Sequence, residues 1–194
     1  MAPNFFSVRS MGLAALGLGL LSFGCKPGGV GDPCTPEDEY QVEFSGFSVD
    51  EVNIESRSFQ CETRVCLVNH FQGRVSCPYG QSETETPIND SNIRCKVPGT
   101  SGTLPEDLIS VPTSPQIVDR RPDNAVYCSC RCDGPDPNAR YCECPSGYAC
   151  EKLVDDLGLG SGQLAGSYCV KDGTQFNPTQ ARGAVCARAI KNCD

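Results

Sequence analysis

Cysteine is the residue type with the greatest capacity for chemistry in this sequence. The 194-residue chain carries 15 cysteines, one histidine and no tryptophan. Cysteine thiolates bind soft metal ions, whereas oxidised cysteines form disulfide bonds. The spacing Cys128-x-Cys130-x-Cys132 would suit either chemistry, but no two cysteines have the Cys-x₂-Cys spacing of zinc sites. In an oxidising compartment such cysteines form disulfides. We therefore expect structural disulfides, no bound metal and no cofactor.

The single histidine limits the kinds of catalysis that the chain could perform. A general base or a catalytic triad built on histidine would have to use His70. The segment Asn69–Gly73 has the residues of a hairpin turn, which favours a solvated position for this side chain. The sequence contains no Gly-x-Ser-x-Gly elbow, no phosphate-cradling loop and no dinucleotide fingerprint. We therefore expect that the protein is not an enzyme.

Residues 1–24 have the pattern of an export signal. Arg9 and the amino terminus supply positive charge, and Met11–Leu21 is an 11-residue apolar run. A membrane-spanning helix needs about 20 apolar residues, so this run is too short to span. The pattern predicts a signal peptide that is removed from the mature protein.

The residues Ser22-Phe23-Gly24-Cys25 resemble the lipobox of bacterial lipoprotein precursors. This resemblance implies cleavage by signal peptidase II before Cys25, which then carries lipid chains such as palmitate and anchors the protein in a membrane. An aspartate directly after the lipidated cysteine would suggest retention in the inner membrane. The residue after Cys25 is Lys26, so we expect the outer membrane or the cell surface. The same residues also fit ordinary signal peptidase, which would give a secreted or soluble periplasmic protein.

The other fourteen cysteines can all pair with one another. They form one group of five and one group of nine: Cys34, Cys61, Cys66, Cys77 and Cys95, then Cys128, Cys130, Cys132, Cys142, Cys144, Cys150, Cys169, Cys186 and Cys193. Because both groups are odd, complete pairing requires at least one disulfide between them. We expect one compact unit or two lobes clamped together, and the connectivity stays open.

Turn residues and the alternation of apolar with polar residues predict the elements around the group of five cysteines. Residues 25–33 contain the lipidated cysteine and a flexible tether rich in glycine and proline. Residues 34–97 form an N-terminal lobe, in which apolar alternation predicts strands over 40–44, 52–54, 59–66 and 74–77. Residues 98–122 contain five prolines and form a linker or a wrapping loop.

Residues 123–194 form a C-terminal lobe that is denser in cysteine. An extended strand would place the sulfurs of Cys128, Cys130 and Cys132 on one face, and Asp133–Asn138 is a turn after which Tyr141–Cys144 runs back. Some of these cysteines are expected to pair across that hairpin. Further along we expect a helical turn over 151–157 and a glycine-rich loop over 158–166. A strand over 167–170 and a short helix over 178–191 are expected to follow. The predicted fold is small and disulfide-rich, mostly β and irregular, with two short helices.

Two further resemblances lie in the mature chain. The nine residues Cys142–Cys150 resemble the closing part of an epidermal-growth-factor-like repeat, and we expect only a shared turn there, with Asp133 and Asp136 solvated. The segments Gly31–Cys34 and Gly73–Gly80, the Cys-x-Cys block and Leu164–Cys169 are similar to cysteine-rich envelope lipoproteins of the myxobacterial type. This similarity implies a location and an architecture but no activity.

The composition narrows the classes of partner. The formal net charge is −8 without a basic run, which excludes nucleic-acid binding. We expect a lipid-anchored cell-envelope protein with a structural or protein-interaction role, whose partners are the membrane and an envelope or surface protein. One alternative is an exported protease or hydrolase inhibitor that presents Arg120 and Arg121 on the loop Pro112–Pro122. Another is a periplasmic metal-binding or redox protein with free thiols.

Overall fold

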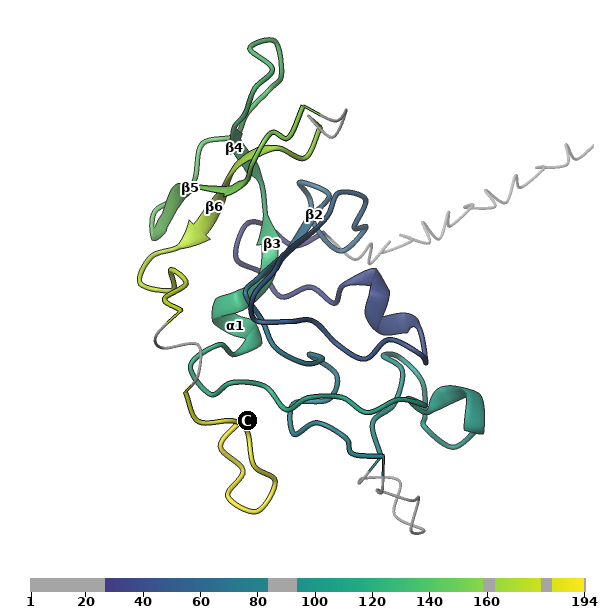
Figure 1. The fold of residues 1–194 in the computed structure, drawn as a ribbon. Coiled ribbons are helices and arrows are strands. Elements are labelled where there is room, and N and C mark those ends of the chain that lie inside the picture. Colours follow the sequence, from purple (N-terminus) through teal and green to yellow (C-terminus); the bar gives the residue numbers. More distant parts are fainter. Residues whose placement is uncertain (1–26, 84–93, 159–162, 179–182, 194) are drawn as a thin grey trace, which may run out of the picture.

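The computed structural model describes residues 27–83, 94–158, 163–178 and 183–193 (Figure 1). The predicted signal peptide and Cys25 lie outside these residues. No helix in the described part of the chain is long and apolar enough to cross a membrane.

The first sheet is antiparallel, with the strand order β1-β2-β3. β1 spans Val52–Glu55, β2 spans Val65–Asn69 and β3 spans Val126–Ser129. β2 lies in the centre and is largely buried, in keeping with its β-branched and apolar sequence. Apolar side chains and cysteines form a core around this sheet: Cys34, Phe47, Cys61, Cys66, Val68, Phe71, Ala125, Val126 and Cys128.

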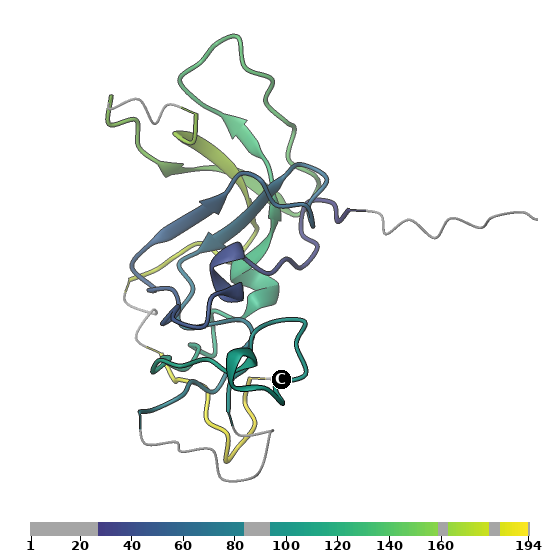
Figure 2. The same cartoon turned by 90° about the vertical axis from the view of Figure 1, so that its right-hand side faces the viewer.

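The second sheet is also antiparallel and has the order β4-β6-β5. β4 spans Arg131–Asp133, β5 spans Tyr148–Val154 and β6 spans Gly166–Lys171. β3 and β4 are separated only by Cys130, so one continuous stretch of chain contributes to both sheets. In both views the second sheet lies at one end of the molecule, and the segment 94–121 lies at the other (Figures 1 and 2).

The helical elements of the described residues are short. They are the 3₁₀ helices η1 (Glu37–Tyr40) and η2 (Pro105–Asp107) and the single-turn helix α1 (Pro122–Ala125). Proline stands at the start of η2 and α1, where the first N–H of a helix has no partner within the helix. The expected fold class, disulfide-rich and mostly β with few helices, is confirmed.

The proline-rich segment packs against the N-terminal half of the chain. Ile109 is fully buried, and Gln81 and Thr113 exchange two backbone hydrogen bonds of 2.7 Å. The Gln116 side chain donates to the Arg74 carbonyl over 2.9 Å. Residues 98–122 therefore wrap the folded chain and contribute to its interior.

A buried charged pair supports the irregular part of the N-terminal half. The Arg74 guanidinium donates to the carbonyls of Gln41 at 3.1 Å and Phe44 at 2.8 Å, and also to the Glu39 carbonyl. The Glu39 carboxylate accepts the backbone N–H groups of Val75 and Ser76. Both charged residues are fully buried. Since buried charges must be compensated, these bonds hold η1 against the chain around Arg74.

Some predicted elements are confirmed and others are wrong. The strands expected over 52–54 and 167–170 are confirmed as β1 and β6, whereas only the last two residues of 59–66 belong to β2. Residues 40–44 do not form a strand, because the chain leaves η1 at Tyr40 through a turn, and 74–77 is a turn closed by one bridge.

Two helix predictions in the C-terminal half are also wrong. The expected helical turn over 151–157 is instead largely β5, because Glu151, Lys152 and Val154 pair with β6, with a shift of register between Lys152 and Val154. In the expected helix over 178–191, the described residues 183–191 form turns and a bridge from Val185 to Ile117, and 179–182 lie outside the described residues.

The start of the described chain is bound to the core. The Gly28 N–H donates to the Gln60 carbonyl over 2.7 Å, and the Gly28 carbonyl accepts the Glu62 N–H over 2.8 Å. Further along, Gly31 and Cys128 share a 2.8 Å backbone hydrogen bond. The expectation of a flexible tether over 25–33 is therefore corrected from Gly28 onward, where backbone pairing orders the chain.

Candidate functional site

The fourteen described cysteines form seven disulfide bonds with one another. The pairs are Cys34–Cys66, Cys61–Cys128, Cys77–Cys95, Cys130–Cys142, Cys132–Cys150, Cys144–Cys169 and Cys186–Cys193. Among them, Cys61–Cys128 is the bond that joins the group of five to the group of nine. The Cys130–Cys142 bond crosses from the strand region to the returning chain, as the hairpin hypothesis required.

Several of these sulfur atoms lie close together. The Cys169 Sγ lies 3.5 Å from the Cys130 Sγ and 3.8 Å from the Cys142 Sγ, although Cys169 is bonded to Cys144. Clusters of three cysteines have metal-site dimensions, but each cysteine in them belongs to a disulfide. A disulfide sulfur offers no thiolate as a metal ligand, so in this oxidised form these clusters consist of structural disulfides.

His70 stacks on Phe176, with ring centroids 3.7 Å apart and planes 6° apart. Its Nδ1 lies 2.8 Å from the Val49 carbonyl oxygen, so Nδ1 carries the proton and donates it there. Burial lowers the pKa of His70, and the neighbouring Arg120 lowers this pKa further. The expectation of a solvated side chain is therefore corrected, because His70 is a half-buried, neutral residue that fastens the C-terminal segment to the end of β2.

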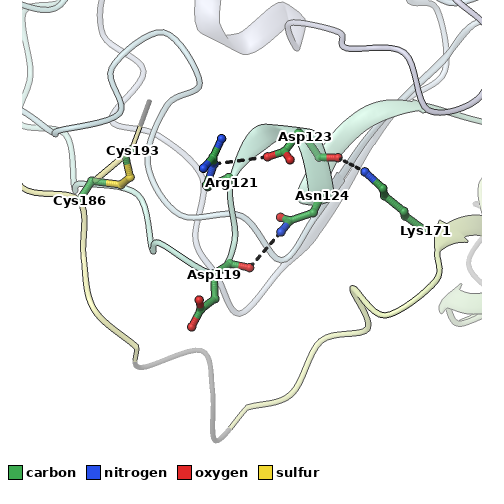
Figure 3. Close-up of polar contacts among 7 residues, drawn as sticks. All are labelled: Asp119, Arg121, Asp123, Asn124, Lys171, Cys186 and Cys193. Carbon is green, nitrogen blue, oxygen red and sulfur yellow. Dashed lines mark hydrogen bonds and ion pairs between the residues drawn. A yellow bond between two sulfur atoms is a disulfide. The ribbon is translucent and has the colours of Figure 1, made fainter. Parts of the chain in front are cut away.

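The two arginines proposed for an inhibitory loop have different environments. Arg120 is buried and donates to the carbonyls of His70 at 3.1 Å and Thr174 at 2.5 Å, and also to that of Asn69. Arg121 lies nearer the surface, where its Nε is 3.5 Å from an oxygen of Asp123 (Figure 3). The structure therefore does not present both cations on one exposed loop.

A polar cleft lies between α1 with the residues before it and the chain that follows β6. Its volume is about 280 Å³, and it is lined by Asp119, Arg120, Asn124, Gly173, Thr174, Gln175 and Asn177. The Asn124 Nδ2 donates to the Asp119 carbonyl over 3.3 Å (Figure 3). The Asn124 Oδ1 is buried and accepts no hydrogen bond from the described residues.

The two walls of this cleft are fastened to each other. The Lys171 Nζ, at the end of β6, donates to the Asp123 carbonyl in α1 over 3.0 Å (Figure 3). The Tyr127 hydroxyl also accepts the Lys171 N–H over 2.9 Å, and burial raises the pKa of Tyr127. The cleft thus presents amide and hydroxyl groups with one carboxylate, and its one cation, Arg120, already donates to the carbonyls of His70, Asn69 and Thr174. This lining suits hydrogen bonding to a polar ligand or to a peptide backbone.

Sequence reasoning did not find this cleft. Its residues come from two segments that lie far apart in the sequence, and none of them belongs to a recognisable motif. The one local signal is Pro122, which can begin a helix and so fixes the positions of Asp123 and Asn124.

The epidermal-growth-factor-like segment has its own connectivity here. Cys142, Cys144 and Cys150 each bond outside the nine-residue segment. Asp136 lies in the expected turn, where its carboxylate accepts the Asn138 N–H over 2.9 Å and its carbonyl accepts the Tyr141 hydroxyl.

Comparison with family models, with curated proteins and with solved structures found no match to this chain.

Proposed function

We propose that this protein is exported, is anchored to the cell envelope by lipid on Cys25, and acts there by binding an envelope or surface partner. The observation that carries this proposal is the closed pairing of the cysteines. Each of the fourteen described cysteines is bonded to another of them, so none is left to bond Cys25. Cys25 is also the cysteine that follows the apolar leader in a lipobox-like sequence.

The disulfide content supports the export half of the proposal. Disulfides form and persist in oxidising compartments, whereas the cytosol keeps thiols reduced. Two of the bonds, Cys34–Cys66 and Cys61–Cys128, lie within the main core, where all four residues are buried. A reduced form would leave these thiols in the interior without the constraint that orders the surrounding loops.

The polar cleft supports the binding half. The Lys171 contact with α1 joins its two walls, and the buried Oδ1 of the lining residue Asn124 has no hydrogen-bond partner among the described residues. A ligand N–H or O–H that reached this oxygen would satisfy a group that is otherwise costly to bury. The inhibitor and free-thiol alternatives have weaker support, since Arg120 is buried and the described thiols are bonded.

The first test is the intact mass of the protein purified from its native envelope, measured with and without reduction before alkylation. We expect a chain of residues 25–194 plus acyl chains, with no alkylation before reduction and fourteen alkylated cysteines after it. The matched control is Cys25→Ala, which should abolish acylation and membrane fractionation but keep all seven disulfides. An unacylated wild-type chain, or a chain with reactive thiols, would contradict the proposal.

The binding half is tested by a photo-crosslinking residue at the cleft. We would place the crosslinker at Gln175, which is exposed in the cleft wall, and a control crosslinker at exposed Asp155 after β5. We expect a discrete adduct from position 175 that Asn124→Ala weakens and that position 155 does not form. Equal adducts from both positions would show that the cleft is not the contact.

A further inference from the structure

The loop between β1 and β2, residues 56–64, presents an unusual exposed side chain. Phe59 is 79% exposed, the largest exposure among the large apolar side chains of the described residues. The Arg64 guanidinium lies over its ring, 4.3 Å from the centroid. Arg57 is also exposed, and Glu62 is the single acid in the loop. This aromatic loop is therefore apolar at one point and net cationic, in a chain whose net charge is −8.

The aromatic loop is held in place from several sides. Ser58 and Arg64 share a 3.0 Å backbone hydrogen bond, and the Arg64 N–H donates to the Cys61 carbonyl over 3.0 Å. Cys61 is bonded to Cys128, and the Thr63 hydroxyl donates to the Ser129 carbonyl. β3 and the Cys61–Cys128 bond fix the base of the loop. The exposed position of the Phe59 side chain is therefore set by the fold around it.

The beginning of the described chain is paired with this same loop. The Gly28 N–H donates to the Gln60 carbonyl next to Phe59, and the Glu62 N–H donates to the Gly28 carbonyl. Cys25 lies only three residues before Gly28. Three residues of extended chain span at most about 11 Å, so a lipid on Cys25 would hold the aromatic loop within that distance of the bilayer.

We propose that the aromatic loop is a membrane-contact surface, with the Phe59 ring in the interfacial region of a phospholipid bilayer and Arg57 and Arg64 at the headgroup phosphates. This inference rests on the proposed lipid anchor at Cys25. An aromatic ring with a cation beside it suits the boundary between acyl chains and headgroups, where the ring loses water and the guanidinium keeps polar partners. The short connection to Cys25 favours lipid as the occupant, because it leaves little room for a protein between the loop and the bilayer.

The absence of tryptophan from the chain allows a sharp test. Phe59→Trp creates a single tryptophan reporter in the full lipidated protein. Leu104→Trp is the matched control, because Leu104 is 52% exposed beside η2, which lies far from the β1–β2 loop in both views (Figures 1 and 2). Both variants are reconstituted into vesicles of phosphatidylethanolamine and phosphatidylglycerol that contain nitroxide-labelled lipid.

We expect the nitroxide lipid to remove most of the tryptophan emission of the Phe59→Trp variant, with a blue shift, and to leave the emission of the Leu104→Trp control unchanged. Adding Arg57→Glu to Phe59→Trp should reduce the quenching, whereas adding Arg140→Glu, a change at another exposed arginine, should not. No quenching in the Phe59→Trp variant, or equal quenching in both variants, would overturn the membrane-contact surface. Vesicle flotation and intact mass report separately on the anchor, so a floating, acylated Phe59→Trp chain without quenching refutes the surface alone.

Discussion

Removing the Cys61–Cys128 disulfide should destabilise the protein more than removing Cys186–Cys193 does. The first bond joins the chain across 67 positions and links β3 to the aromatic loop. The second closes a ring across seven positions near the C-terminus. The double substitutions Cys61→Ala with Cys128→Ala and Cys186→Ala with Cys193→Ala therefore form a matched pair of perturbations.

The expected difference follows from the loops that the bonds close. The Cys77–Cys95 bond lies within the larger loop and shortens its effective path to about 50 residues, for which chain entropy gives a loss of ~4 kcal/mol. The same relation gives a loss of ~2 kcal/mol for the seven-residue separation of Cys186–Cys193. Cys61 and Cys128 are also fully buried, so their replacement by alanine leaves a cavity that adds to the first loss.

The assay is equilibrium unfolding in guanidinium chloride without reductant, followed by circular dichroism. We expect the midpoint to fall for both double variants, and to fall further for the Cys61/Cys128 variant. Its m-value should also rise, because the unfolded chain loses its one link between the two cysteine groups and exposes more surface. An equal or smaller loss for Cys61/Cys128 would refute the reasoning that loop size and burial set the cost.

Three further predictions concern the interior and the turns. Arg74→Met should lower the free energy of unfolding by about 3–5 kcal/mol, because it leaves the carbonyls of Glu39, Gln41 and Phe44 without the buried guanidinium that donates to them, and denaturant unfolding measures this loss. Gly73→Ala should destabilise more than Gly147→Ala in thermal unfolding; both glycines have positive φ, but a Cβ at 73 would overlap the Ser114 carbonyl and one at 147 meets nothing within 4 Å. Burial raises the pKa of Glu39 above its usual 4.5, so the folded state favours the protonated carboxyl. The contribution of this shift to the free energy of unfolding is therefore fully present below pH 4.5 and is lost as pH rises through the pKa of the folded state. Glu39→Gln should therefore flatten this part of the pH dependence of unfolding, and an unchanged slope would contradict the assignment.

The class of fold could be predicted because cysteine content and short alternating segments report on it directly. The alternation of Val52 and Ile54 identifies β1, and the odd sizes of the two cysteine groups require a bond such as Cys61–Cys128. Which cysteines pair depends on the approach of distant strands, for example β2 beside β3, and no local pattern specifies that approach.

The errors arose where tertiary contacts override local preference. Glu151, Lys152 and Leu153 favour a helix by propensity, but pairing with β6 holds them in β5. Residues 40–44 alternate like a strand. Their carbonyls at Gln41 and Phe44 accept hydrogen bonds from the buried Arg74 guanidinium, as the Glu39 carbonyl in η1 does, and not from a neighbouring strand. The cleft at Asn124 was missed for the same reason, since its two walls meet only after β3 and β6 are in place.

The pattern of disulfides also decides what a single proteolytic cut would do. A cut between Cys34 and Cys128, or between Cys130 and Cys169, leaves the two fragments joined, because at least one bond spans the break. The only unspanned site between these two stretches is at Ser129, which is fully buried in β3.

The C-terminal end differs, because the last bond, Cys186–Cys193, closes only on itself. One nick between Val170 and Val185 would therefore leave a C-terminal peptide retained only by non-covalent contacts, such as the backbone hydrogen bonds that join Val118 to Ala184 and Gln116 to Cys186. Proteolysis at such a site would therefore release this end of the chain, while the remaining body keeps its six other disulfides.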